Sequence, residues 1–463
     1  MIFSSPEFLL LLLPIYTLSC LFFARVGAFL VISSLFYIYT SAEFFLFLVA
    51  FVAFVFLLSR YLNNTALFAI VILSPLLYFK YSDWVLSQFG SLGHEALMLP
   101  LGISFYTFQL MSFFYETNKK EKFLDVLHFV TFFPQLIAGP IVRSNQFLPQ
   151  KGPSKLFSRR IKFVYFGITI FAFGLAKKVL IADNIGVFLD DFDYFFLSNG
   201  GVHFFDILFA IPAILIHLYF DFSAYSDMAI GLGLMAGYRI PINFKMPMSA
   251  ISITSFWQRW HISLTEFFRD YLLNSLLLHS ARVKRQKLAF GISLVTYFSI
   301  LGLWHGAGFN FILFGLLNGI AVLIAYSGKF SIVERWYKWV RMLGLHMLLF
   351  LIFVNFRYEV SDTKAMAGIL LHEIIDIFSF QNTVITDQFA FVLLLCYLWS
   401  VFGFEGYELY RRKSRNDVPD IVVYGRRQLI ALVAKTNFIW SPLVFIYALF
   451  YVGETPTFVY FQF

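Results

Sequence analysis

The chain of 463 residues contains only two cysteines, Cys20 and Cys396, and both lie inside apolar runs far apart in the sequence. This placement gives little support for a disulfide framework, a thiolate metal site or a cysteine nucleophile. Charged residues are scarce as well, at 13% of the chain, whereas soluble domains carry about 25%. The composition therefore excludes an ordinary soluble globular protein.

Several signatures of cofactor and metal chemistry are missing too. GLGLMAG at 231–237 has the wrong glycine spacing for a dinucleotide fingerprint; Gly233 and Gly237 are better explained as a small-residue contact between helices. HEIID at 372–376 lacks the second histidine of a zinc-protease helix, and no Walker loop is present. We therefore expect no bound metal and no bound cofactor. The sequence also lacks the motifs that would indicate a primary pump, an oxidoreductase or a metallohydrolase.

Hydrophobic residues, in contrast, make up 60% of the chain, aromatic residues 21%, and 63 residues are Phe. Apolar runs of about 20 residues, the length that crosses a bilayer as a helix, recur along the sequence. We predict an all-α, multi-pass integral membrane protein with about eleven to thirteen membrane helices, in a single domain over 1–463. The predicted spans are 7–24, 27–40, 43–59, 66–80, 97–116, 161–182, 203–225, 289–304, 309–326, 342–356, 387–409 and 436–453, with a shorter, proline-broken segment at 125–142.

The first apolar run has no basic residue before it and no small-residue cleavage pattern after it, which favours a membrane helix over a signal peptide. The net charge of +8 is unevenly distributed. By the positive-inside rule the basic clusters face the cytoplasm, and 183–202 and 357–386 lie outside. These clusters are 117–122, 151–160, 281–287, 329–341 and 410–427.

The basic clusters set the topology and contact anionic membrane lipid. They are also compatible with a cytoplasmic site for a polyanionic donor, and no nucleic-acid partner is indicated. Lys177 and Lys178 do not fit this topology, because they lie near the outer end of their span. Either the topology shifts there, or the two lysines face a water-filled cavity.

The segment 239–287 is the one sizeable part that is not expected to span. Ser255 and Gln258 have capping-box spacing, which predicts the start of an amphipathic helix at the membrane interface. Its apolar face would carry His261. The residues of that face recur at helical spacing: Trp257, Trp260, His261, Leu264, Phe267, Phe268 and Tyr271.

Polar groups inside membrane segments are costly, so by default they line a cavity or a substrate path. The clearest are Asp221, Asp227, Gln135, Arg143, Lys177, Lys178, Asn310 and His305. Asp221 and Asp227 lie about 240° apart around a helix and cannot both pair with one small group. We favour structural roles for Asp227, Gln135 and Arg143. Pro134 and Gly139–Pro140 predict a broken or re-entrant segment.

His305 stands in SILGLWHGAGFNF at 299–311, next to three glycines: Gly302, Gly306 and Gly308. Glycine weakens a helix but allows close approach of backbone or ligand. Desolvation favours the neutral imidazole, the form that takes a proton from a hydroxyl. This pattern favours a reactive site over the alternative, a core histidine bonded to a carbonyl group.

Eight stretches together resemble the membrane-bound O-acyltransferase superfamily, and within it the bacterial branch of the alginate O-acetyltransferases. They run in one order along the chain: MIFSS (1–5), LPLGISFYTFQ (99–109), FFPQLIAGPIVR (132–143), GLAKKVLIADN (174–184), LYFDFSAYSDMAIGLGLMAGYRIPINF (218–244), SITSFWQRWHISLTEFFRDYLL (252–273), LGLWHGAGFNFILFGLLNG (301–319) and YFQF (460–463). The pair WQRWHIS and LWHGAGFNF is highly specific.

The resemblance implies a helical bundle around a tunnel, with His305 as the catalytic residue. His261, 44 residues earlier, is the second signature position, and three roles are open for it: contact with the donor, positioning of the acceptor, or support of the fold. The expected tunnel residues are Trp304, Asn310, Asp221, Tyr225, Arg259, Gln135, Arg143, Lys177 and Lys178.

The resemblance further implies that His305 activates an acceptor hydroxyl, which attacks the thioester of a cytoplasmic donor, acetyl-CoA. The expected partner is a periplasmic polysaccharide O-acetyltransferase or an acetyl-relay protein, and the expected location is the bacterial inner membrane. The many Phe residues and the lysine-rich loops suggest an AT-rich genome, which favours peptidoglycan as the acetylated polymer. Alginate or another exopolysaccharide, and D-alanyl transfer to teichoic acid from a carrier protein, are alternatives. A small-molecule transporter and a scaffold with structural histidines are the alternatives outside this family.

Overall fold

The computed structural model describes residues 3–23, 26–90, 97–117, 121–150, 156–198, 201–327, 338–373, 387–402, 405–410 and 420–424. Its N-terminal helices are α1 (Leu13–Leu18, between π-helical turns Phe8–Leu12 and Ser19–Phe23), α2 (Val26–Thr40), α3 (Ala42–Tyr61), α4 (Thr65–Gln88), α5 (Ile103–Glu116), α6 (Phe123–Thr131), α7 (Phe133–Leu136) and α8 (Ser144–Phe147). Then follow α9 (Phe157–Lys177), a π-helical turn Lys178–Ala182, α10 (Asp183–Leu197) and α11 (Phe204–Met235). A 3-10 turn Pro247–Ser249 leads to α12 (Ile253–Trp257), α13 (Ile262–Phe268), a π-helical turn Arg269–Leu273, α14 (Asn274–Ser280), α15 (Gln286–His305), α16 (Phe309–Tyr326), α18 (Lys338–Arg357), α19 (Val360–Glu373) and α20 (Asp387–Phe402).

The prediction of a helical, multi-pass membrane protein is confirmed. Among the described residues, seven helical stretches are long and apolar enough to cross a membrane: Ala42–Tyr61, Thr65–Gln88, Phe157–Leu197, Phe204–Met235, Gln286–His305, Phe309–Tyr326 and Lys338–Arg357. Two shorter apolar stretches, Phe8–Phe23 and Val26–Thr40, precede them. The predicted span 436–453 lies outside the described residues, so the number of eleven to thirteen stays a prediction.

Several boundaries differ from the prediction. The segment 183–202, predicted to lie outside, begins as α10, because Ile185, Leu189 and Phe192 form a buried apolar stripe among its acidic residues. The segment 357–386, also predicted to lie outside, contains α19.

The C-terminal part of the described chain also differs. The predicted span 387–409 is wrong beyond Phe402: strand β1 (Glu405–Tyr410) follows and pairs antiparallel with β2 (Asp420–Tyr424).

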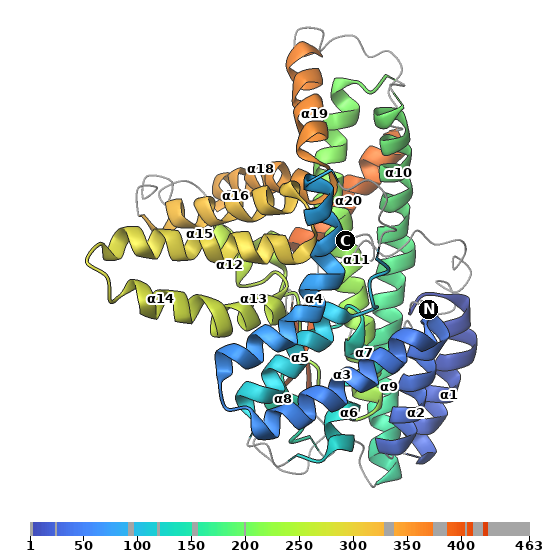
Figure 1. Ribbon diagram of the computed structural model, residues 1–463. Helices are drawn as coiled ribbons and strands as arrows, with labels where there is room; N and C mark the ends of the chain where they lie inside the picture. The colour runs from blue at the N-terminus through green and yellow to red at the C-terminus, as the bar shows by residue number, and fades with distance from the viewer. Residues whose placement is uncertain are drawn as a thin grey trace.

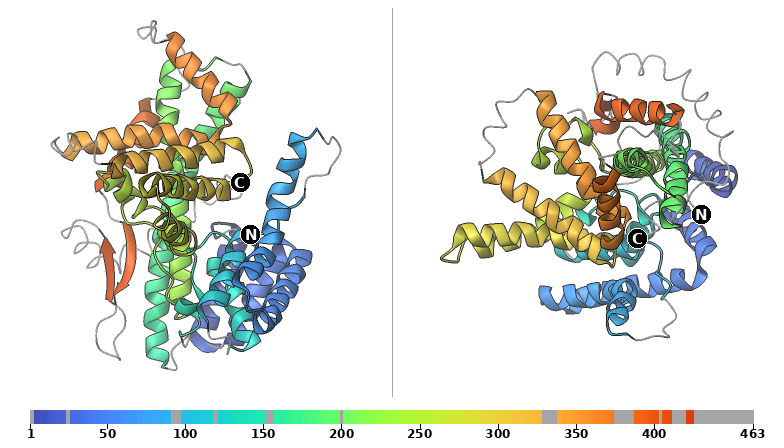
Figure 2. Two further views of the ribbon diagram at one scale, coloured as in Figure 1. Left: turned by 60° about the vertical axis from the view of Figure 1, so that its left-hand side comes forward. Right: turned by 90° about the horizontal axis from the view of Figure 1, so that it is seen from above.

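Helix α11 is the central element of the bundle. It has 32 residues, and 78% of its most apolar stretch is buried inside the protein. In Figure 1 α9, α10 and α11 run upright while α14, α15, α16 and α18 lie across them, and Figure 2 shows α11 end-on among the other helices. A helix that is apolar around most of its circumference is buried on all sides, and α11 fits this rule apart from a few buried polar residues such as Asp221 and Asp227.

Two buried ion-pair groups join α11 to the end of α9 and the π-helical turn. Lys177 Nζ lies 2.8 Å from Asp227 Oδ2, and Lys178 Nζ lies 2.8 Å from Asp221 Oδ1 and 2.7 Å from Asp183 Oδ1. The two aspartates of α11 therefore have different partners, as their spacing requires. Each of the two lysines that did not fit the predicted topology thus pairs with a carboxylate inside the protein.

Glycines set how closely α9 and α11 approach. A Cβ atom at Gly231 would lie 2.7 Å from Phe171 N, and one at Gly174 would lie 2.7 Å from Ala224 O, both closer than real contacts. Gly233 and Gly237 do not make the helix contact that the sequence suggested. Gly233 faces the Ile240 side chain, and Gly237 turns the chain after α11 with a φ of +79°.

Helices α15 and α16 pack against each other through a second pair of glycines. A Cβ atom at Gly302 would lie 2.8 Å from Gly315 Cα, and one at Gly315 would lie 2.8 Å from Ser299 Cα. No side chain fits between the two backbones here. This contact fixes the direction of the chain on both sides of His305.

We expect Gly302→Ala to separate α15 from α16 and to lower the free energy of unfolding by about 1–3 kcal/mol, the usual cost of overpacking. Thermal unfolding of the purified protein in detergent measures the change. Gly344→Ala in α18 is the matched control, because nothing lies within 4 Å of a Cβ atom there. Equal melting temperatures for the two variants would show that the glycine contact is unimportant.

Candidate active site

His305 is the last residue of α15, and the chain then runs extended through Gly306 and Gly308 before α16 begins. The space beside each glycine is occupied by protein. A Cβ atom at Gly306 would collide with the Phe311 ring, and one at Gly308 with the Asn310 side chain. The glycines therefore let the chain turn tightly against the first turn of the next helix.

The end of α15 is held by side chains of α4. The last carbonyl groups of a helix have no partner within the helix. Lys80 Nζ donates to the carbonyl oxygens of Trp304 (2.5 Å) and His305 (3.1 Å), and the Tyr81 hydroxyl donates to that of Leu303 (2.9 Å). A lysine is a favourable partner for these groups because a helix C-terminus carries partial negative charge.

The His305 side chain is buried among aromatic rings, with 5% of its surface exposed. Its ring centroid lies 4.8 Å from that of Trp304, 5.0 Å from Phe356 and 6.1 Å from Phe314. The His261 ring lies 6.4 Å away. Two histidines that are distant in the sequence thus share one apolar environment.

His261 occupies a break between two short helices rather than the face of one helix. Ser252, not Ser255, caps the first of them, α12, by accepting a hydrogen bond from the backbone N–H of Ser255 (3.2 Å). His261 then has a φ of +43°, which is unfavourable for a residue with a Cβ atom. The predicted amphipathic pattern holds, because Trp257, Trp260 and His261 are all buried.

The His261 ring is fully buried and meets the Phe222 ring of α11 at a right angle, with 4.6 Å between centroids. This residue lies outside the membrane-spanning stretches. Burial lowers the pKa of His261 to about 3, so its imidazole is neutral at physiological pH.

Asn243 holds the backbone at His261 in place. Its carbonyl oxygen accepts from Ile262 N (2.8 Å), its Oδ1 accepts from Ser263 Oγ (2.6 Å) and its Nδ2 donates to Ser226 Oγ of α11 (3.1 Å). Ser263 Oγ also accepts from the N–H of Ile141 (2.9 Å). The non-helical segments near 141, 243 and 262 are therefore joined to α11 by one network of buried hydrogen bonds.

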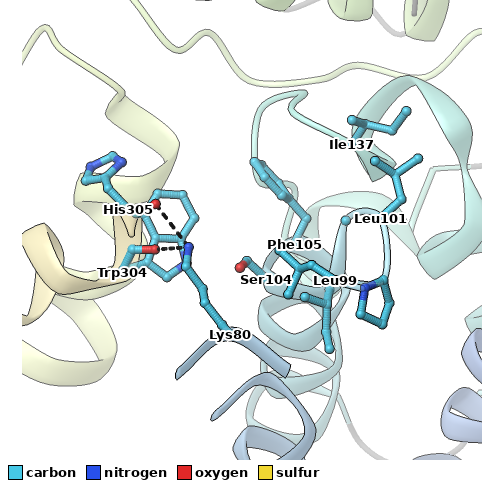
Figure 3. Close-up of a pocket in the computed structure, with 11 residues that line it drawn as sticks. Lys80, Leu99, Leu101, Ser104, Phe105, Ile137, Trp304 and His305 are labelled. Atoms are coloured by element: carbon cyan, nitrogen blue, oxygen red, sulfur yellow. Dashed lines mark hydrogen bonds between the residues drawn. The ribbon is translucent and has the colours of Figure 1, made fainter. Parts of the chain in front are cut away.

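A partly open cavity of about 180 Å³ lies between the α15–α16 break and the segment 99–105 that leads into α5. Figure 3 shows Lys80 and Trp304 on one side of it, facing Ser104 and Phe105 on the other, with the His305 ring farther from the 99–105 segment than Trp304 is. The lining is mostly apolar. A small, mostly apolar cavity with a histidine among its lining residues suits a proton transfer from a bound hydroxyl.

Of the residues predicted from the sequence, the structure brings His305, Trp304 and His261 together. The other tunnel candidates bind within the protein: Arg259 donates to Lys245 O (3.3 Å), Asn310 to Asn355 O (3.2 Å) and Gln135 to Phe129 O, and Arg143 pairs with Asp270 (2.7 Å). Tyr225 stacks on Phe3, with 4.5 Å between ring centroids, while Asp221, Lys177 and Lys178 form the ion pairs described above. Their contribution to a tunnel stays a prediction.

Two residues of the site were missed in the sequence, Lys80 and Asn243. Lys80 could have been identified from the sequence, because it is an isolated cation in the predicted span 66–80. Asn243 could not, because it lies in a non-helical stretch without periodicity.

The fold and the site define a multi-pass membrane protein in which two ring-enclosed histidines lie close together and one of them, His305, lines a small cavity. The family model of MBOAT, the membrane-bound O-acyltransferase family, matches residues 25–355. The chain belongs to this family, and the resemblance found in its motifs is confirmed.

Several relatives with assigned names are similar to this chain. The peptidoglycan O-acetyltransferase of Helicobacter pylori is 37% identical over 286 residues, which cover 54% of this chain and 53% of the relative. The probable alginate O-acetylase AlgI of Pseudomonas aeruginosa is 34% identical over 365 residues, covering 70% and 66%. The teichoic acid D-alanyltransferase of Bacillus subtilis is 29% identical over 250 residues, covering 52% and 61%. The chain thus matches between about half and two thirds of the length of these relatives.

We expect Asn243→Ala to lower the free energy of unfolding by about 1–3 kcal/mol, because the buried groups of Ser226 and Ser263 would lose a partner. Thermal unfolding in detergent measures the loss of stability. The control is Asn274→Ala, at an exposed asparagine of α14. The same melting temperature for both would contradict a structural role of the Asn243 network.

Proposed function

We propose that the protein is a membrane O-acyltransferase in which His305 is the general base. The observation that carries this proposal is the meeting of His305 with His261 from a second structural element, with 6.4 Å between their ring centroids, beside a small apolar cavity. Membership of the MBOAT family supports it. A transporter has no need of such a pair, and a scaffold has no need of the cavity.

In the proposed reaction an acceptor hydroxyl bound in the cavity gives its proton to the imidazole of His305. The hydroxyl oxygen forms a bond to the acyl carbon of a thioester, the C–S bond breaks, and the proton passes to the leaving thiolate. The products are an ester and a free thiol, so atoms and charge balance. Both cysteines lie outside the surroundings of His305 described above, which favours direct transfer over an acyl-cysteine intermediate.

The donor that we propose is acetyl-CoA, taken from the cytoplasm. Its phosphates suit the basic clusters predicted to be cytoplasmic, such as 281–287, which extends into the first residues of α15. A carrier-protein thioester is the alternative, as the similarity to a teichoic acid D-alanyltransferase suggests.

The acetyl group would then reach a polysaccharide outside the bacterial inner membrane, through a periplasmic transferase or an acetyl-relay protein as the partner. We favour peptidoglycan as this polymer. The similarity to a peptidoglycan O-acetyltransferase supports the choice, together with the composition of the chain. Alginate or another exopolysaccharide is the second candidate, because the probable alginate O-acetylases are nearly as similar.

We expect His305→Ala to lower the rate of acetyl transfer by about 100- to 10,000-fold, the usual contribution of a general base. The measurement is acetyl transfer from labelled acetyl-CoA by the purified protein together with its partner, and ester-linked acetate on the cell-wall glycan in cells. His372→Ala, at an exposed histidine of α19, is the matched control. Unchanged transfer by His305→Ala at normal membrane levels would refute the assignment.

Two variants of His261 separate the role of its ring from that of its backbone, because its φ of +43° is unfavourable for a residue with a Cβ atom. Both His261→Ala and His261→Gly remove the ring, but only glycine adopts this conformation without strain. We expect the Gly variant to be more stable than the Ala variant by about 1–2 kcal/mol, with the same loss of transfer in both. Wild-type activity in His261→Gly would show that the ring has no part in the reaction.

A further inference from the structure

Lys80 is a cation inside the membrane-spanning helix α4, and its Nζ reaches the end of α15. It donates to the carbonyl oxygens of Trp304 and His305 and lies 5.7 Å from the centre of the Trp304 ring. It also lines the cavity, opposite Ser104 and Phe105 (Figure 3). One side chain therefore contacts both the backbone of His305 and the cavity.

Its partners distinguish Lys80 from the other cations buried in the bundle. Lys177, Lys178 and Arg357 each pair with aspartates. The partners recorded for Lys80 within the described residues are two carbonyl oxygens and an indole ring, all of them uncharged. A charge inside a membrane-spanning helix is expensive and by default marks a functional place, which points to a role for Lys80 beyond joining two helices.

The chain after His305 explains why the end of α15 needs this support. Gly306 and Gly308 follow directly, with Ala307 between them, and α15 gains no further helical turn. Without partners for their carbonyl groups, Trp304 and His305 would fray, because such groups are otherwise left unsatisfied in an apolar environment. Tyr81 binds one residue earlier, at Leu303, and holds the rest of α15 in place.

We propose that Lys80 is a positioning residue for acyl transfer: by bridging the carbonyl groups of Trp304 and His305 it fixes the last turn of α15, and with it the His305 imidazole, at the wall of the cavity. This inference rests on the proposed function of His305. Small displacements of a reacting group cost large factors in rate, so the bridge affects the chemical step more than donor binding.

The test compares Lys80→Met, which keeps the length and apolar stem, with Lys80→Arg, which keeps the charge and can donate to both carbonyl groups. We expect Lys80→Met to lower kcat by about tenfold or more with KM for acetyl-CoA changed less than about twofold, as for a group that acts on the transition state. Lys80→Arg restores kcat to within about threefold of wild type. Lys364→Met, at an exposed lysine of α19, is the matched control and leaves kcat unchanged.

A second measurement does not depend on activity. Hydrogen exchange followed by mass spectrometry reports the amides of 303–309, and we expect faster exchange there in Lys80→Met, with no change in α11. Wild-type kcat in Lys80→Met, or unchanged exchange at 303–309, would overturn the inference. So would a loss of kcat that Lys80→Arg does not restore, or faster exchange throughout the protein, which would indicate general destabilisation.

The controls separate this inference from the proposed function. If wild type transfers acetyl and His305→Ala does not, the proposed function stands and the Lys80 variants are judged by kcat and exchange together. If wild type transfers no acetyl from any thioester tested, the proposed function fails, and with it the role of Lys80 in transfer. The exchange measurement still decides whether Lys80 fixes the end of α15.

Discussion

The backbone hydrogen bonds at the helix breaks are the constraint on which the site depends. In an apolar environment each N–H and C=O group that leaves a helix needs another partner. At the break after His305 the partners come from Lys80 and Tyr81 of α4. At the break before Ile262 they come from Asn243 and the segment around it. The two histidines are held by groups that lie far away in the sequence.

Helix α11 connects these two supports. It presents Phe222 to the ring of His261 and Ser226 to the amide of Asn243. The residues directly beside these two in the sequence, Asp221 and Asp227, bind the two lysines at the end of α9. The ion pairs thus join α11 to α9, while Phe222 and Ser226 of the same helix contact the site. A shift of α11 would move His261 and strain the ion pairs at the same time.

The sequence predicted correctly those features that depend only on the composition or spacing of residues within one segment. The apolar runs predicted α3, α4, α15 and α16 because burial in lipid depends on composition alone. The motifs gave His305 and His261 through resemblance, and the spacing of Asp221 and Asp227 correctly excluded a shared partner. Lys80, in contrast, acquires its role from carbonyl groups more than 200 residues away, and no local pattern contains that information.

The wrong predictions also concern features that depend on contacts between distant segments. The apolar pattern predicted from Ser255 onward is correct, but the single helix is wrong. The pattern continues through the break between α12 and α13 because both helices direct their apolar side chains to the same core. A positive φ at His261 cannot be read from periodicity, because the side-chain pattern is nearly the same with and without it. The glycines of GLGLMAG were assigned to the wrong contact for a similar reason: their spacing permits several faces, and only packing against Phe171 selects Gly231.

The pairing of the two histidines constrains how the proposed reaction can proceed. With 6.4 Å between ring centroids and aromatic rings around both, two imidazolium ions side by side would repel strongly in this low-dielectric environment. Protonation of both rings at once is therefore strongly disfavoured. A proton that His305 takes from an acceptor has to leave before the next acceptor can be activated, and the thiolate released by the donor is the group formed at that moment to receive it. Coupling deprotonation of the acceptor to departure of the thiol returns the site to its neutral state after each transfer, with no need for a water path to the buried rings.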